Sequence, residues 1–97
     1  MKYSPDQIKN LVLKNKSVRI AFTKDRHPMF GKLVMLSDGE DLLDKKFIRF
    51  VRESDLQMFE GTHPIQMYDQ NQHIIGSVNL TKLFSITDFE LITEYEN

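Results

Sequence analysis

Apolar and polar positions alternate at helical spacing in the first part of the chain, with Ile8, Leu11 and Val12 forming one stripe. Ser4 and Gln7 occupy the two positions of a capping box, in which each side chain bonds the backbone amide of the other residue. Pro5 stands between them at the first helical position, which tolerates its missing N–H. We therefore expect a helix over about 5–15. Because so short a helix is unstable alone, it must pack on the rest of the chain.

Beyond Lys16 the pattern changes to a period of two, which is typical of strands with one buried face. Strands are expected over 18–23, 29–36, 46–52, 65–68, 73–80, 83–86 and 89–92. Short connections favour an antiparallel meander, and Gly31 indicates a bulge or sharp bend in the second strand. Segment 53–63 is ambiguous.

The expected fold class is mainly β (α+β): an N-terminal helix followed by a small, strongly bent antiparallel barrel. The 97 residues make one domain, with the barrel over about 17–92 and an acidic tail over 93–97. The predicted core consists of Ile8, Leu11, Val18, Ile20, Phe22, Leu33, Leu36, Ile48, Phe50, Ile74, Val78, Leu83 and Ile86.

Charge is distributed unevenly along the chain. Residues 1–52 hold 12 Lys/Arg against 6 Asp/Glu, a net charge of +6, whereas residues 53–97 hold 1 against 8, a net charge of −7. Such asymmetry can mark an anion-binding face, or it can cancel when folding intermixes the two halves. Because both halves resemble parts of one sheet, the second interpretation is favoured.

Composition points to a cytoplasmic protein without a membrane partner. The chain has no cysteine, which excludes disulfides and thiolate metal sites. No apolar segment follows Lys2, so no signal peptide is expected, and no apolar run approaches the length of a transmembrane helix.

Residues that could carry catalysis do not form a recognisable pattern, so we expect neither an enzyme nor a cofactor. The spacing of His27, His63 and His73 suits no shared helix face, and no metal site is expected from them. Four acids crowd one loop without the pattern of a calcium-binding loop, and a solvated turn is expected there. They are Asp38, Glu40, Asp41 and Asp44.

Two features are compatible with binding. Basic and aromatic residues interleave over 45–52, where cations could contact phosphates and rings could stack on bases. The alternative, which is favoured, is a strand with Phe and Ile in the core and Arg at its edges. Flexible methionines could line an adaptable contact surface, or they could simply fill the core. The second interpretation is favoured. They are Met29, Met35, Met58 and Met67.

The segment from Val18 to Asp38 resembles the Sm-like (Lsm/Hfq) family. An alternating strand is followed by Phe30-Gly31-Lys32-Leu33 and Leu36, and Gly31 stands where that family bends its second strand. The family's aspartate position holds Ser37, with Asp38 next, and its asparagine position falls near Asp41. Val78 to Ile86 is similar to the second motif, with Thr81-Lys82 in place of Arg-Gly.

The resemblance implies an Sm-like or SH3-like barrel and a non-catalytic, RNA-associated module. Lys45, Lys46 and Lys82 would then contact phosphates, because they match the two loops that face RNA in the family. The acids over 38–44 should weaken such binding. The alternative is a structural or protein-interaction module that has lost the RNA site.

A homo-oligomer is expected, because a barrel this small is marginally stable alone and a bent sheet leaves two edges open. If the basic half formed one edge and the acidic half the other, head-to-tail contacts would be attractive and could close into a ring. A two-fold dimer through the helix or the methionines is the alternative.

Overall fold

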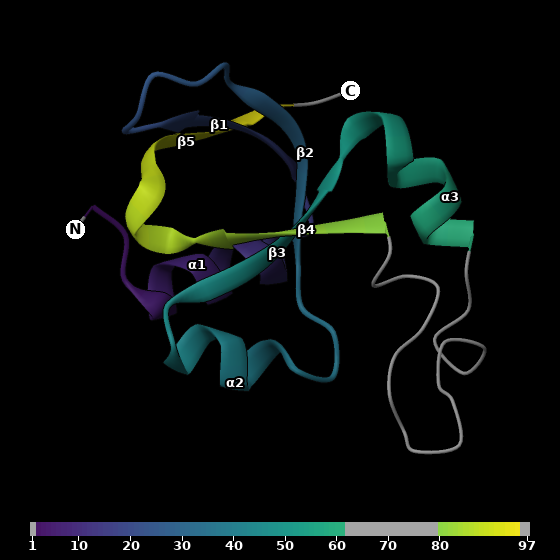
Figure 1. Cartoon of the computed structure of the whole chain (residues 1–97). Coiled ribbons are helices and arrows are strands. Elements are labelled where there is room, and N and C mark those ends of the chain that lie inside the picture. The colour runs from purple at the N-terminus through teal and green to yellow at the C-terminus, as the bar shows by residue number, and fades with distance from the viewer. Residues whose placement is uncertain (1, 62–79, 96–97) are drawn as a thin grey trace.

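The computed structural model describes residues 2–61 and 80–95, which form an N-terminal helix and a five-stranded antiparallel sheet (Figure 1). The helix α1 (Pro5–Lys14) begins with the expected capping box. The Ser4 amide donates to Gln7 Oε1 at 2.8 Å, and the Gln7 amide donates to Ser4 Oγ at 3.2 Å. Ile8 is fully buried, so α1 packs on the core as expected.

The sheet has the strand order β4-β3-β2-β1-β5, and every neighbouring pair is antiparallel. The strands are β1 (Ser17–Phe22), β2 (Met29–Val34), β3 (Phe47–Arg52), β4 (Thr81–Ser85) and β5 (Phe89–Tyr95). The sheet curls strongly without closing, so β4 and β5 remain its outer strands (Figure 1). The predicted fold class is confirmed.

Gly31 stands where β2 changes its partner strand. Residues 29–31 of β2 pair with β1, and residues 31–34 pair with β3, so Gly31 belongs to both ladders. A Cβ atom built on Gly31 would lie 1.9 Å from the carbonyl oxygen of Val51 and 2.7 Å from Cζ of Phe50. Only glycine allows this approach of the two strands.

Most of the predicted core is buried. The confirmed positions are Ile8, Val18, Ile20, Phe22, Leu33, Ile48, Phe50 and Ile86, while Leu11 packs partly buried against them and Leu36 is half-buried. The prediction of Leu83 is wrong, because its side chain is 50% exposed and its neighbour Phe84 is buried instead. Phe84 pairs with Ile48, and this register turns Leu83 to the opposite face beside Arg49. Ile74 and Val78 lie outside the described residues.

Several element bounds differ from expectation. The acidic turn contains a short helix, α2 (Gly39–Asp44), which buries Leu43. The ambiguous segment forms a 3-10 turn, η1 (Glu53–Asp55), and a helix, α3 (Leu56–Gly61). The tail is shorter than expected, because β5 runs to Tyr95, which pairs with Ser17. The strand expected over 65–68 and most of that over 73–80 lie outside the described residues.

The two charge halves do not form opposite edges of the sheet. The basic half supplies the inner strands β1, β2 and β3, and the acidic half supplies both outer strands. The condition for a head-to-tail contact between the halves is therefore not met. Ion pairs such as Lys2–Glu90 and Lys32–Glu60 join the halves, as expected from intermixing.

No helix within 2–61 or 80–95 is long and apolar enough to cross a membrane.

Candidate functional site

Three segments distant in sequence meet at one end of the sheet, at the 3-10 turn η4 (Ile86–Asp88) between β4 and β5. The Thr23 amide donates to the Asp88 carbonyl oxygen at 2.9 Å, and the Ile86 amide donates to the Lys46 carbonyl oxygen at 2.9 Å. The β1–β2 loop and the start of β3 thus flank the turn on either side, on the left of Figure 1. We call the surface formed by residues 23–28, 45–46 and 86–88 the turn end.

The turn end carries four exposed cations that form no ion pair with a described residue: Lys24, Arg26, Lys45 and Lys46. Six other cations, in contrast, are paired with carboxylates: Lys2, Lys9, Lys14, Lys32, Arg49 and Arg52. The other three, Lys16, Arg19 and Lys82, also form no ion pair with a described residue, but they lie outside the turn end. The turn end therefore holds four of the seven cations that have no ion pair within the described residues.

Arg26 is held against aromatic rings at the turn end. Its Cζ lies 4.4 Å from the ring centroid of Phe22 and 5.4 Å from that of Phe84. Both rings are buried, so the guanidinium covers the edge of the core while the Arg26 side chain remains exposed. A guanidinium plane held this way is a surface on which a nucleobase can stack.

Acids at the same end moderate its charge. Asp25 is in the β1–β2 loop, Asp44 ends α2, and Asp88 ends the turn. Four cations against three carboxylates leave only a small positive excess. The site therefore suits direct contacts between phosphate groups and individual lysines. Its net charge is too small for a strong long-range attraction of a nucleic acid.

The structure brings together two of the three predicted phosphate contacts. Lys45 and Lys46 precede β3 at the turn end, and Lys46 has a φ of 66°, an uncommon left-handed conformation outside glycine. Lys82 was expected in a loop, but it lies within β4, where it pairs with Phe50. It lies four positions along the β3–β4 ladder from Lys46. The resemblance to the second Sm-like motif predicts the turn between the last two strands at Thr81-Lys82. In the structure this turn is at Ile86–Asp88.

The interleaved segment 45–52 is mainly structural. Ile48 and Phe50 are buried, while Arg49 and Arg52 bind carboxylates. Arg49 donates from Nε to both Asp38 oxygens at 3.2 Å and from Nη2 to Asp38 Oδ2 at 2.6 Å. Its Nη1 donates to Thr81 Oγ1 at 3.0 Å. The favoured alternative from the sequence is confirmed for Ile48 and Phe50, whereas Phe47 is 36% exposed and Arg49 lies within the strand rather than at its edge. The Arg49 network connects the start of α2 to β3 and β4.

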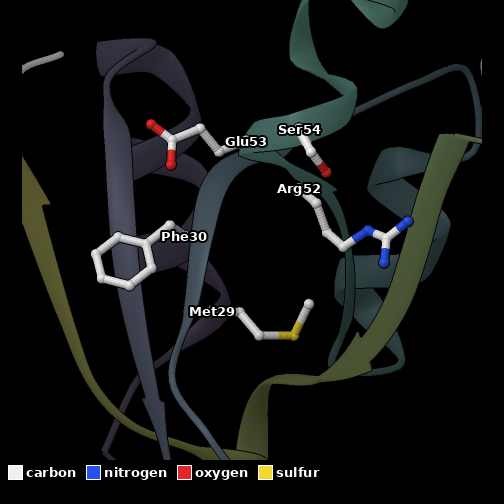
Figure 2. A pocket seen from close by; sticks show the side chains of 5 residues that line it. All are labelled: Met29, Phe30, Arg52, Glu53 and Ser54. Atoms are coloured by element: carbon white, nitrogen blue, oxygen red, sulfur yellow. The ribbon is translucent and has the colours of Figure 1, made fainter.

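A shallow hollow of about 320 Å³ lies at the opposite end of β3, lined by Met29, Phe30, Arg52, Glu53 and Ser54. Figure 2 shows the Phe30 ring and the Glu53 carboxylate on one side and the Arg52 guanidinium pointing to the other. That guanidinium is already bound to Asp55, with Nη2–Oδ2 at 3.1 Å. The Phe30 ring packs edge-on against Tyr95 at 5.6 Å between centroids. The hollow thus offers an aromatic wall without a free cation.

Tyr95 beside this hollow has a perturbed hydroxyl. Burial raises the pKa of Tyr95, and the negative charge of the nearby Glu53 raises it further, while Ser17 acts in the opposite direction. The hydroxyl oxygen is buried without an aligned hydrogen bond to any described residue. Tyr95 therefore stays neutral and packs as an aromatic side chain.

The remaining sequence candidates are dispersed. His27 is exposed in the β1–β2 loop, while His63 and His73 lie outside the described residues. Of the methionines, Met29 and Met35 pack on the core, Met58 is 65% exposed, and Met67 lies outside the described residues. Asp38 and Glu40 bind Arg49 and Lys9, and within the described ranges no cluster of His, Asp or Glu could hold a metal ion.

Sequence reasoning missed Lys24 and Arg26. The segment 24–28 is typical of a turn, and the only signal of binding in it is that it contains two basic residues. Its proximity to Lys46 depends on the contacts of the turn between β4 and β5, more than sixty positions further along the chain.

Comparison of the chain with family models, curated proteins and solved structures finds no match.

Proposed function

We propose that the chain is a small, non-catalytic Sm-like module that associates with single-stranded RNA at the turn end. The observation that carries this proposal is the convergence of Lys24, Arg26, Lys45 and Lys46 around the β4–β5 turn, with no described carboxylate paired to them. The N-terminal helix and the bent five-stranded antiparallel sheet support the Sm-like part.

Each residue has a role that its chemistry suits. Lys24, Lys45 and Lys46 present flexible ammonium groups to phosphates, and Arg26 presents a guanidinium plane, backed by Phe22, to a base. The three carboxylates nearby limit the affinity, and the phosphate contacts of the lysines make it depend on salt. A single strand is the favoured form because its bases are unstacked, and RNA is chosen over DNA because of the resemblance to the Sm-like family.

Replacing both Lys45 and Lys46 by Gln is expected to weaken RNA binding about 10-fold at about 0.05 M salt, because two phosphate contacts are lost. The dependence of log K on log salt should become shallower by about 1.4, at about 0.7 per contact for a single strand. Fluorescence anisotropy with labelled single-stranded octamers measures both quantities.

Lys82→Gln is the matched control, because it removes one lysine away from the turn end and should leave affinity unchanged. If wild-type protein shows no low-micromolar binding at low salt, the RNA proposal is rejected. Equal losses in the control and in the double variant would reject the turn end as the site.

A second candidate, a protein-interaction module that assembles with itself, is favoured by the outer strands. Within the described residues, β4 and β5 each have a ladder on one side only. Leu83 on β4 and Leu91 on β5 are about half exposed. The single charge of β4 is Lys82, whereas β5 carries Glu90 and Glu94, which are paired with Lys2 and Lys14. No like charges therefore oppose a β4–β5 contact between copies.

Light scattering coupled to size exclusion is expected to give a mass above that of one 11.4 kDa chain at high protein concentration. The contact removes apolar surface and unpaired strand edges from water, which is the physical reason for association. A mass of one chain at every concentration up to the solubility limit would refute self-assembly.

A further inference from the structure

An exposed aromatic ring forms one wall of the shallow hollow at the end of β3. Phe30 is 45% exposed, although it belongs to β2, an inner strand of the sheet. Its ring packs against Tyr95 with 78° between the ring planes and 5.6 Å between the centroids. Tyr95 thus restricts the orientation of the Phe30 ring, and solvent still reaches much of its surface.

A carboxylate stands beside this ring. Figure 2 shows the Glu53 carboxylate and the Phe30 ring on the same side of the hollow. Glu53 is also close to Tyr95, because burial raises the pKa of the Tyr95 hydroxyl and the charge of Glu53 raises that pKa further. Within 2–61 and 80–95, no cation forms an ion pair with Glu53. One ligand can therefore contact both the ring and the charge.

The cations near Glu53 are bound to other acids. Arg52 Nη2 lies 3.1 Å from Asp55 Oδ2, and its guanidinium points away from Glu53 in Figure 2. Lys32 Nζ lies 3.8 Å from Glu60 Oε2. The segment formed by η1 and α3 contains three acids and no basic residue, so these two pairs leave the charge of Glu53 unbalanced. This charge favours a cationic ligand.

An arginine side chain has both properties that match the hollow. Its planar guanidinium stacks on aromatic rings, and its fork of donors forms two parallel hydrogen bonds with one carboxylate. A lysine ammonium is a point charge without the plane or the fork. The volume of about 320 Å³ is at the lower end of the range for ligand pockets, about 300–1,000 Å³, and suits one side chain more than a cofactor.

We propose that this hollow is a docking site for an arginine side chain of a protein partner, with the guanidinium stacked on Phe30 and paired with Glu53. Met29 and Ser54 line the rest of the hollow. Because the hollow is shallow, it covers only the end of a side chain, and the partner's own chain supplies the remaining contacts. The site is separate from the turn end, since Lys45 and Lys46 precede the other end of β3.

The capped tripeptide Gly-Arg-Gly is the probe, titrated into the isotope-labelled full chain at about 0.05 M salt and followed by NMR. A single side-chain contact should give a dissociation constant on the order of 1 mM. Arg19 stands opposite Phe30 on β1, and its positive charge limits the affinity. The largest amide shifts are expected at Phe30, Glu53 and Ser54.

Two changes to the probe test its chemistry. Lysine in place of arginine should weaken binding about 3-fold, because the stacked plane and the second hydrogen bond are lost. Citrulline in place of arginine keeps the shape and removes the charge, so its binding should not saturate.

Two variants test the residues of the hollow. Glu53→Gln should weaken binding of the arginine peptide about 5-fold, because it removes the charge-assisted pair. Phe30→Leu should weaken it about 3-fold, because it keeps an apolar side chain and removes the ring. Both residues are exposed, so the variants keep the fold. Asp41→Asn is the control for charge: Asp41 is exposed on α2, before the other end of β3, and the constant should not change.

Equal affinities for the arginine and citrulline peptides would overturn the proposal, as would equal affinities of the wild type, Glu53→Gln and Phe30→Leu. Shifts centred away from the hollow, or no saturation at about 20 mM peptide, roughly twenty times the expected constant, would also overturn it. The variant that replaces both Lys45 and Lys46 by Gln should bind the peptide like the wild type. Loss of RNA binding therefore leaves this site intact, and failure of this site leaves the RNA proposal intact.

Discussion

Gly31→Ala is expected to lower the free energy of unfolding by about 3 kcal/mol or more, at the upper end of overpacking effects. The added methyl group would overlap the Val51 carbonyl oxygen at 1.9 Å, and the Phe50 ring stands on the same side at 2.7 Å. Neither neighbour can move independently, because Phe50 and Val51 are fully buried and paired in both ladders of β3. The strands would have to separate at the bend.

Urea denaturation followed by far-UV circular dichroism measures this loss. Gly39→Ala is the matched control, because its new methyl group would meet Met35 side-chain atoms at 2.8 to 3.1 Å. These are side-chain atoms on a half-buried residue, whereas the atom met at Gly31 is a backbone oxygen fixed by two strand ladders, so the loss in Gly39→Ala should be smaller than that in Gly31→Ala. Equal unfolding midpoints for the two variants would contradict the role of Gly31.

The parts of the fold that sequence predicts well are those fixed by local patterns. The capping box of Ser4 and Gln7 determines where α1 begins, without help from distant residues. Val18, Ile20 and Phe22 alternate with polar or small residues, and they form β1 with one face in the core. Gly31 predicts a bulge or a sharp bend, and the structure places the change of partner strand at this residue.

The parts that sequence does not predict depend on distant partners. The run over 83–86 is apolar on both faces, so only its register with β3 decides that Phe84 rather than Leu83 is buried. Helix α2 was not expected, because its acidic residues indicated a solvated turn. Leu43 becomes buried only through packing of α2 against β3. The turn end likewise joins the β1–β2 loop to Lys46 through backbone bonds to the β4–β5 turn.

Asp38→Ala is expected to lower the free energy of unfolding by about 2 to 3 kcal/mol, because it leaves Arg49 largely buried without its carboxylate. The Arg49 side chain is 15% exposed, and three of its hydrogen bonds go to Asp38. The expected loss is below that of a fully buried pair, since Asp38 itself is 38% exposed.

Thermal unfolding and urea denaturation measure this effect, with Asp55→Ala as the matched control. Asp55 also binds an arginine, Arg52, but that side chain is half exposed, so the control should lose at most about 0.5 kcal/mol. Replacing Arg49 by Met in the Asp38→Ala background should restore much of the stability, because the unpaired charge is then gone. A loss in Asp38→Ala no larger than in Asp55→Ala, or no recovery in the double variant, would show that the connection between α2, β3 and β4 does not depend on this pair.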